Sequence, residues 1–328
     1  MTFLRMALAA LVLATVTIAA PQAKAGAETG QGVGVVEYNL GDQAFHDPTV
    51  SVPMELAAVV HYPRDLGGRP HPLIVQEHGS WWSCVDPIAK TPGGDWPCPP
   101  GQRSLPSFRG YDYLGEKLAE RGFIVVSISA NAINAHLLGD EGYYSRAHLV
   151  NKHLELWRDL ARGEGPLART LGRFRGHVDL SRVGTMGHSR GGKGVMWQAS
   201  DKHTPEWPAG VRIRAVVPLA PVYFNSTEDD NSDVLVTRVP FKVVVGTCDG
   251  AVRTVGLQYV KDAEGRNPDI SSVTLTGANH NFFNTEWSPG KIGGEDDAPA
   301  DCVGKLSPGQ QRGDAVREIV SFFASRLR

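Results

Sequence analysis

The chain has 328 residues, of which 41% are hydrophobic and 8% aromatic, and its formal net charge is −2. This apolar content supports a buried core and excludes a disordered chain. The weak acidic balance offers no basic surface for nucleic acid or for anionic membranes, so we expect no nucleic-acid partner.

The first segment has the layout of a secretory signal peptide. Arg5 precedes an apolar run over residues 6–20, and an A-x-A cleavage site ends at Ala25. The run is shorter than the roughly 20 apolar residues that span a bilayer, so we expect no stable membrane insertion. The sequence predicts a signal peptide over residues 1–25 and a single secreted domain, extracellular or periplasmic, over residues 26–328.

Apolar, β-branched runs alternate with helical patterns along the rest of the chain, after a small and polar stretch over residues 26–34 that we expect to be a loose N-terminus. The expected strands are Glu55–Tyr62, Pro72–Glu77, Phe123–Ser129, Val183–Met186, Ile213–Leu219, Phe241–Gly246 and Val273–Thr276. The expected helices are Tyr113–Arg121, Tyr144–Ala161, Lys193–Ser200 and Asp314–Leu327. This alternation predicts an α/β protein with a mostly parallel central sheet and helices on both faces.

Three polar residues follow strands of this sheet, at the edge where α/β proteins place their sites. Ser189 lies in Gly187-His188-Ser189-Arg190-Gly191, which has the G-x-S-x-G form of a nucleophile elbow. Asp249 follows the strand that ends at Gly246, and His280 follows the strand that ends at Thr276. The order Ser, Asp, His is that of the α/β-hydrolase fold, which we therefore predict.

The elbow glycines can also be aligned with a phosphate-binding loop, G-x-x-x-x-G-K-[ST]. Gly194 stands where that loop needs a Ser or Thr for magnesium. No carboxylate ends a strand at the place expected for a second metal contact. The sequence therefore favours the serine elbow and predicts neither a cofactor nor a metal.

The roles of the three residues follow from the chemistry of acyl transfer. A serine hydroxyl becomes a useful nucleophile when a base takes its proton, and His280 can do so for Ser189. Asp249 would orient the imidazole and stabilise the imidazolium that forms. Asp229 and Asp230, after the strand that ends at Leu219, are alternatives to Asp249.

An oxyanion hole and an aromatic pocket are expected beside the nucleophile. The oxyanion needs two backbone donors. We assign them to the N–H groups of Arg190, directly after the serine, and Ser80, in the loop after Glu77, with Trp81 as the alternative to Ser80. Aromatic residues border this loop and the histidine loop, and we expect four of them to line the substrate pocket: Trp81, Trp82, Phe282 and Phe283.

The four cysteines predict two disulfides, because their number is even and the compartment is oxidising. Four cysteines allow three connectivities. We favour Cys84–Cys98 and Cys248–Cys302, of which the second would tether the turn of Asp249 to the segment beyond His280. A zinc site is disfavoured, because the spacings contain no C-x-x-C and no paired histidines.

The stretches HGSWWSC, VDLSRVGTMGHSRGG, CDG and GANHNFFNTEW resemble those of secreted bacterial α/β-hydrolases. GHSRGG is similar to the elbow of chlorophyllases, and GHSxGG to that of cutinase-like polyester hydrolases and platelet-activating-factor acetylhydrolases. The resemblance runs from about Ala57 to the end of the chain. It implies hydrolysis of carboxylic esters without a cofactor.

The sequence thus predicts a secreted, monomeric serine esterase that acts on a small ester, a lipid or a polyester through an acyl-enzyme. One alternative is a serine peptidase or amidase on the same fold, which the expected lack of a propeller-sized domain disfavours. Another is a non-catalytic secreted binding protein, because fold alone does not fix function.

Overall fold

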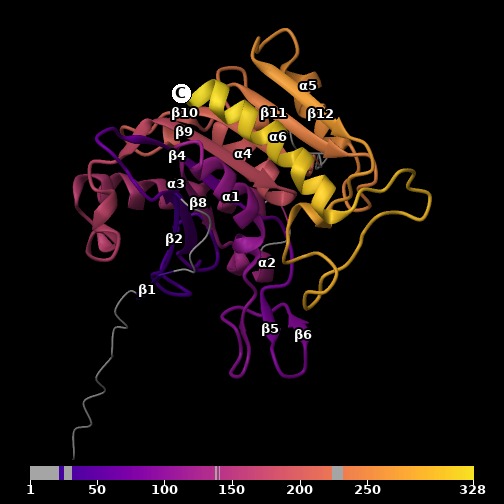
Figure 1. The fold of residues 1–328 in the computed structure, drawn as a ribbon, viewed down its shortest axis with the longest axis horizontal. Helices are drawn as coiled ribbons and strands as arrows, with labels where there is room; N and C mark the ends of the chain where they lie inside the picture. The colour runs from indigo at the N-terminus through magenta and orange to yellow at the C-terminus, as the bar shows by residue number, and fades with distance from the viewer. Residues whose placement is uncertain (1–21, 26–31, 137–138, 140, 224–231) are drawn as a thin grey trace, which may run out of the picture.

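A central sheet organises the computed structural model, which describes residues 22–25, 32–136, 139, 141–223 and 232–328. Within these residues the sheet has nine strands in the order β1-β2-β3-β8-β4-β9-β10-β11-β12 (Figure 1). Their bounds are β1 (Gln22–Ala25), β2 (Val33–Asn39), β3 (Ala57–Pro63), β8 (Ile124–Ile128), β4 (His71–Glu77), β9 (Val178–His188), β10 (Ile213–Leu219), β11 (Phe241–Gly246) and β12 (Ile270–Leu275). The pairs from β8 to β12 are parallel, and those from β1 to β8 are antiparallel.

Helices cover both faces of the sheet, as predicted. Their bounds are α1 (Asp112–Ala119), α2 (Asn131–His136), α3 (Glu141–Arg162), α4 (Arg190–Ala199), α5 (Gln258–Ala263) and α6 (Pro308–Leu327). The 3-10 helices are η1 (Ser107–Tyr111), η2 (Pro166–Arg169), η3 (Gly172–Phe174), η4 (Thr204–Glu206), η5 (Ser232–Val234), η6 (Val255–Leu257) and η7 (Asn281–Phe283). The seven strands and four helices expected from the sequence are all present, with ends that differ by a few residues.

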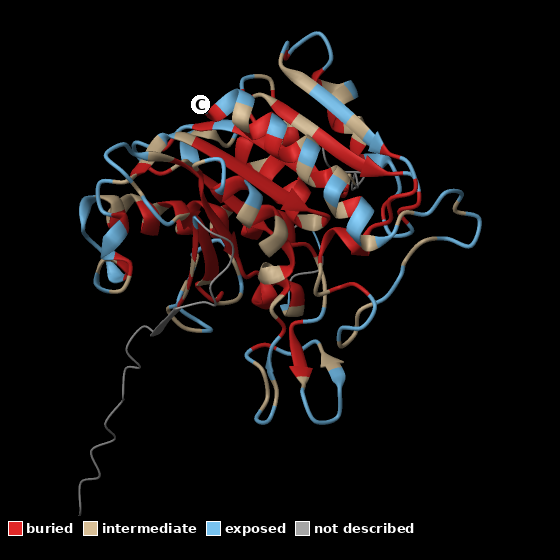
Figure 2. Ribbon diagram, in the orientation of Figure 1, coloured by how far each residue is buried: buried red, intermediate tan, exposed pale blue. Residues whose placement is uncertain are grey.

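Alternation along the strands divides the core into two layers. In β4, Leu73 and Val75 pack with residues of α3 and α4, whereas Ile74 packs with residues of α1 and α6. Successive strand side chains point to opposite faces, so a strand that is buried on both faces must be apolar throughout. Figure 2 shows the result, with the central strands buried along most of their length. The chain has the α/β-hydrolase fold.

The N-terminal region differs from the expectation of a loose tail. Val33 and Gly34 begin β2, which pairs with β3 over seven residues. The strand was missed because its first residues are small and glycine-rich. The short strand β1 lies inside the predicted signal peptide and pairs with β2. The rest of that segment, residues 1–21, lies outside the described residues, and no described helix is long and apolar enough to cross a membrane.

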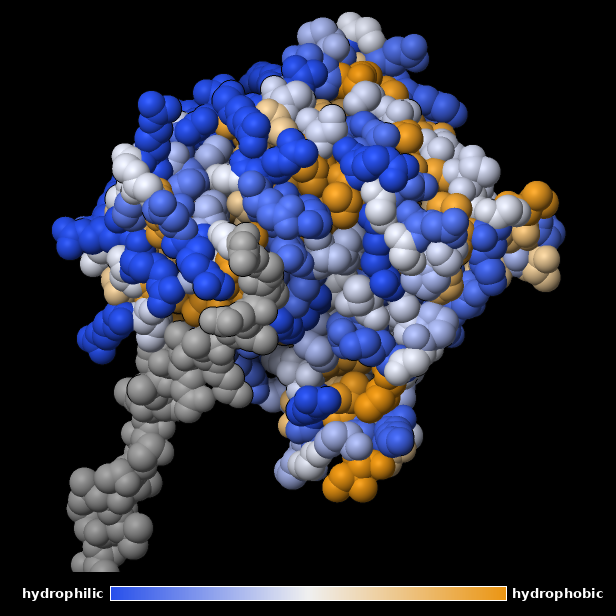
Figure 3. Space-filling model, viewed as in Figure 1, coloured by the Kyte–Doolittle hydropathy of each residue, from blue (hydrophilic) through white to orange (hydrophobic). Residues whose placement is uncertain are grey.

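A small three-stranded sheet projects from the body below α2 (Figure 1). It consists of β5 (Cys84–Asp86), β6 (Thr91–Gly93) and β7 (Arg103–Ser104), which are too short to show a sequence period. The surface is mainly hydrophilic, but hydrophobic residues lie at the tip of this projection (Figure 3). Ile88, in the turn between β5 and β6, is 91% exposed.

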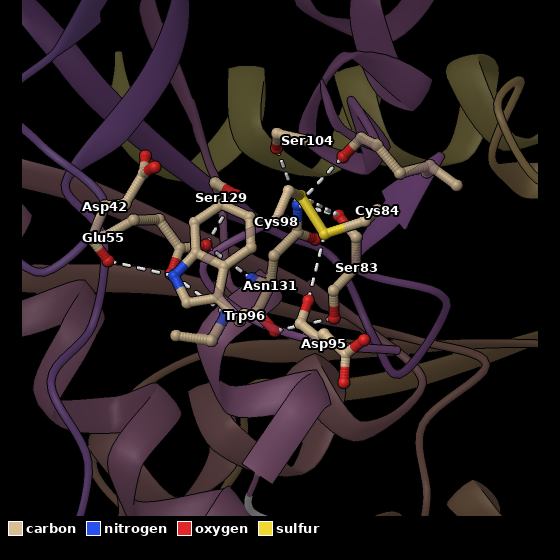
Figure 4. The surroundings of a disulfide bond; sticks show 12 residues. Asp42, Glu55, Ser83, Cys84, Asp95, Trp96, Cys98, Ser104, Ser129 and Asn131 are labelled. Atoms are coloured by element: carbon tan, nitrogen blue, oxygen red, sulfur yellow. Dashed lines mark hydrogen bonds between the residues drawn. A yellow bond between two sulfur atoms is a disulfide. The ribbon is translucent and has the colours of Figure 1, made fainter. Parts of the chain in front are cut away.

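Both preferred disulfides are present in the structure. Cys84 and Cys98 are joined with a Cα–Cα distance of 5.6 Å, and Cys248 and Cys302 with a distance of 5.2 Å. The first closes the small sheet, where the Trp96 indole donates to the backbone oxygen of Asp42 at 2.9 Å (Figure 4). The second joins the turn after β11 to the long loop between β12 and α6.

Candidate active site

Ser189 lies on a sharp turn between β9 and α4. Its φ of 58° and ψ of −120° are unusual for a residue with a Cβ, and such strained conformations cluster at functional positions. The backbone of Ser189 is fixed on both sides, because its N–H donates to Leu219 O at 2.9 Å and its carbonyl accepts from Val222 N at 3.1 Å. The turn places Ser189 at the N-terminus of α4, as expected of a nucleophile elbow.

The glycines of the elbow are required by close packing. A Cβ on Gly187 would lie 1.9 Å from Gly191 O, and a Cβ on Gly191 would lie 2.8 Å from His78 O. A Cβ on Gly194 would lie 2.7 Å from the Arg146 Cβ. The ammonium group of Lys193 lies 4.3 Å from the centre of the Tyr143 ring. The glycines therefore serve the contacts of strand, helix and loop, and no phosphate need be invoked to explain them.

Asp249 and His280 lie side by side at the ends of neighbouring strands. The Asp249 Oδ2 and the His280 Nδ1 are 2.7 Å apart, and both side chains are buried. The other oxygen of Asp249 accepts the N–H groups of Ala251, Val252 and Arg253 at 2.7–3.1 Å. An ionised carboxylate can only accept, so His280 Nδ1 carries the proton of this bond. In the neutral imidazole, Nε2 is then left as the acceptor.

A layer of aromatic rings packs against the His280 imidazole. The His188 ring lies 4.6 Å from the His280 ring, and the Trp287 ring lies 4.9 Å from that of His188. Burial, with a smaller effect of His280, holds the pKa of His188 well below its ordinary value. His188 therefore stays neutral, and it adds no repulsive charge beside His280 when that imidazole takes a proton.

The loop after β4 lies directly against the serine. A Cβ on Gly79 would lie 2.5 Å from the Ser189 Cβ. The Gly79 carbonyl is held by His78 Nδ1 at 2.9 Å and by Asn134 Nδ2 at 3.1 Å. The C=O and N–H of a trans peptide point in opposite directions. The anchored carbonyl therefore turns the Ser80 N–H away from His78 and Asn134, and no described residue accepts a hydrogen bond from it.

A buried polar network supports this loop from below. The Arg146 guanidinium donates to His78 O at 3.1 Å and to Asn134 Oδ1 at 2.5 Å, and it lies 3.9 Å from the Glu77 carboxylate. Burial raises the pKa of the Glu77 carboxyl, and Arg146 opposes that rise. Sequence reasoning missed Asn134 and Arg146. The charged residue that ends the apolar run of β4, Glu77, is a signal that could have indicated a buried partner.

The four aromatic residues expected to line the substrate pocket differ in how far they are exposed. Trp81 is half-buried and stacks on Trp287 at 5.1 Å, and Trp82 is 44% exposed. Phe283 is fully buried in the core layer under α1 and α6, and its place in the substrate pocket stays a prediction. Phe282 keeps 4% of its surface exposed. The sequence cannot distinguish core aromatic residues from those that line a pocket, because a short apolar pair after a strand is compatible with both.

Asp229 and Asp230 lie outside the described residues. Over residues 32–136, 141–223 and 232–328, no group of three or more His, Cys, Asp or Glu side chains is arranged to hold a metal ion. The Arg190 guanidinium packs over the Tyr143 ring at 5.4 Å.

Similarity to known proteins covers the centre of the chain. A family model described as "PET hydrolase-like" (PETase) matches residues 100–286, a range that contains Ser189, Asp249 and His280. "Cutinase est1" of Thermobifida alba is 30% identical over 118 residues, which are 36% of this chain and 32% of that protein. "Cutinase 2" of Thermobifida cellulosilytica is 30% identical over 113 residues, 34% of each chain. The chain thus spans about a third of the length of the curated relatives that it matches.

Proposed function

The chain belongs to the PET hydrolase-like family, and on that premise we propose that it is a serine hydrolase that cleaves carboxylic esters. Ser189 is the nucleophile, His280 the general base and Asp249 the residue that orients it. The observation that carries the proposal is the 2.7 Å contact between Asp249 Oδ2 and His280 Nδ1, with the His280 ring 4.6 Å from that of His188, the residue before a serine on a strained elbow.

The reaction proceeds in two stages through an acyl-enzyme. His280 Nε2 takes the Ser189 proton as the serine oxygen bonds to the ester carbonyl carbon, and the negative charge moves to the carbonyl oxygen. The N–H groups of Arg190 and Ser80 stabilise that oxyanion. The protonated imidazole then gives its proton to the departing alcohol. Water, activated by the same histidine, releases the acid and restores Ser189.

The neighbouring groups support this division of roles. The two oxygens of Asp249 have separate partners. One accepts three backbone N–H groups, and the other pairs with the imidazolium. His188, whose pKa burial holds low, remains an uncharged surface for the His280 ring. The steps need no cofactor, and we propose none.

The proposed substrate is a small ester, a lipid or a polyester, and the names of the family and of the relatives support an ester. Relatives carry the name cutinase, and the family description names a PET hydrolase. We also propose that the chain is exported by a signal peptide cleaved near Ala25, and that residues 26–328 act as one monomeric catalytic domain without membrane insertion. Two disulfides suit an oxidising compartment.

Covalent labelling tests the nucleophile. A fluorophosphonate probe should label the purified protein, and Ser189→Ala should abolish both the label and the hydrolysis of p-nitrophenyl esters, with a loss of roughly 10⁶-fold in kcat. Ser200→Ala is the matched control, because Ser200 lies at the opposite end of α4 and its buried hydroxyl has no hydrogen-bond partner among the described residues. Label that persists in Ser189→Ala would refute the assignment.

A substrate panel separates esterase from amidase. The panel contains p-nitrophenyl esters of graded acyl length, a polyester film and a peptide amide. We expect turnover of the esters and none of the amide. Cleavage of the amide alone would establish the peptidase, and no turnover together with no labelling would establish the binding protein.

A further inference from the structure

The segment between η7 and α6, residues 284–307, packs against the two turns that carry Asp249 and His280. It projects at the right of Figure 1, in yellow. Apart from Cys302, sequence patterns assigned its residues no role, because its glycines, prolines and acidic residues resemble an ordinary solvated loop. Part of it turns back toward the core, and there Asp297 is half-buried. Residues 287–307 follow the range that the family model matches.

The Asp297 carboxylate accepts three backbone N–H groups from these turns. Its Oδ2 accepts from Gly250 N at 2.9 Å and from His280 N at 3.1 Å. Its Oδ1 accepts from Asn281 N at 2.8 Å. One oxygen atom thus joins the residue after the acid to the base itself. Hydrogen bonds from N–H groups to an ionised carboxylate are stronger than those to a neutral acceptor.

This junction adds a second connection to the direct one between the two turns, in which Cys248 N donates to Ala278 O at 2.9 Å. Asp249 and His280 come from separate turns, so their hydrogen bond depends on how those turns are held together. We propose that Asp297 is a positioning residue of the active site, one that fixes His280 against Asp249 without contacting substrate. The proposal rests on the proposed function, in which these residues are base and acid.

Packing around Asp297 supports a dedicated arrangement. A Cβ on Gly250 would lie 1.9 Å from Asp297 O, so the acid turn approaches the loop as closely as only glycine allows. The preceding residue, Asp296, accepts from Asn279 Nδ2 at 2.9 Å, which ties the loop to the residue before the histidine. Cys302, five positions after Asp297, is bonded to Cys248, the residue before the acid. Contacts on both sides therefore hold the carboxylate in place.

Removal of Asp297 should affect catalysis more than binding. In Asp297→Ala the two turns can separate, and displacement of a catalytic group by about 1 Å can cost on the order of 100-fold. We expect kcat for a p-nitrophenyl ester to fall about 10- to 100-fold with KM nearly unchanged. Asp297→Asn keeps one acceptor oxygen, so its loss should be smaller.

The pH profile provides a measurement that a merely structural role would not change. The titratable groups that contact the His280 ring or backbone, among the described residues, are Asp249, His188 and Asp297. Removing the Asp297 charge and loosening the Asp249 contact both make protonation of His280 less favourable. The acidic limb of kcat/KM should therefore move to lower pH.

Asp301→Asn is the matched control. It removes the same charge from the same loop, where Asp301 is exposed and no described residue bonds to its side chain. It should retain wild-type kcat and an unshifted acidic limb. If Asp297→Ala and Asp297→Asn match this control in both measurements, or lose only thermal stability, the proposal is overturned.

Proton NMR separates this proposal from the proposed function. The hydrogen-bonded Nδ1–H of His280 should give a downfield resonance in the wild type and in Asp301→Asn, and it should weaken or disappear in Asp297→Ala. This signal requires no turnover. An inactive, unlabelled wild type would refute the proposed function alone, whereas an unchanged resonance in Asp297→Ala would refute the positioning role alone.

Discussion

Ser189 and the Asp249–His280 pair are held by different kinds of contact. The serine turn is enclosed by backbone and buried side chains, at distances that leave no room for a methyl group at Gly79, Gly187 or Gly191. The acid and the base also have close backbone contacts, at Gly246 and Gly250, but they lie on loops that a carboxylate and a disulfide connect. Figure 2 shows this difference as buried strands beside a partly exposed loop between β12 and α6.

The two kinds of contact should respond differently to substitution. Where backbone atoms leave no room for a side chain, no small local movement can accommodate one, because close-packed interiors transmit strain. A polar tether can be loosened one bond at a time. We therefore expect changes on the serine side to abolish the site and changes on the acid–base side to weaken it by degrees.

The largest expected effect comes from filling the elbow. Gly187→Ala places a Cβ 1.9 Å from Gly191 O, so β9 or α4 must move. We expect complete loss of activity and a cost of about 3 kcal/mol or more in the free energy of unfolding, measured by urea denaturation.

Gly313→Ala is the control for this change. Gly313 lies inside α6, and a Cβ there meets nothing within 4 Å. Alanine should stabilise the helix by up to about 1 kcal/mol and leave turnover unchanged. If Gly187→Ala were as active as this control, β9 and α4 would be able to accommodate the added methyl group, against what their packing indicates.

The second effect concerns the Cys248–Cys302 disulfide, whose removal can be compared with that of Cys84–Cys98. Replacing Cys248 and Cys302 with serine should lower the free energy of unfolding by about 4 kcal/mol and kcat by about 10- to 100-fold. Replacing Cys84 and Cys98, which close a shorter loop in the small sheet, should cost about 3 kcal/mol with little change in kcat. Equal kcat in the two double variants would show that the tether does not position the acid and base.

The same contrast explains what the sequence could predict. Ser189, Asp249 and His280 each follow an apolar strand, and strands buried on both faces can be predicted from their continuous apolar sequence. Asp297 has no such pattern, because its partners are backbone N–H groups of residues 47 and 17 positions away. Asn134 lies on a six-residue helix, α2, whose first N–H groups are capped by Glu55 from a distant segment. Contacts of this kind depend on the folded arrangement, so they produce no periodic pattern in the local sequence.

A third, smaller effect should follow from Asn134→Ala. This change removes one of two donors to the Gly79 carbonyl, so the Ser80 N–H becomes less well directed while His78 still holds the loop. Loss of an oxyanion donor costs about 10²- to 10³-fold, and partial loosening should cost less, about tenfold in kcat. Asn151→Ala, a buried asparagine on α3 away from the loop, is the control and should keep wild-type kcat. Equal kcat in the two variants would remove Asn134 from the site.

The smallest effect is on the pH dependence of stability. Burial lowers the pKa of His78 from 6.5 to about 3, so the folded protein keeps this side chain neutral while the unfolded chain takes up a proton below pH 6.5. The unfolded state binds more protons in that range, so this contribution to stability falls as the pH falls. His78→Gln removes it, and the stability deficit of the variant should shrink by about 1 kcal/mol between pH 8 and pH 6. His153→Gln, whose histidine pKa is also lowered to about 3 but which contacts Tyr38 instead of the oxyanion loop, should show the same shrinkage with unchanged kcat. His78→Gln should also lower kcat, and equal kcat in the two variants would mean that His78 supports the fold without directing the Ser80 N–H.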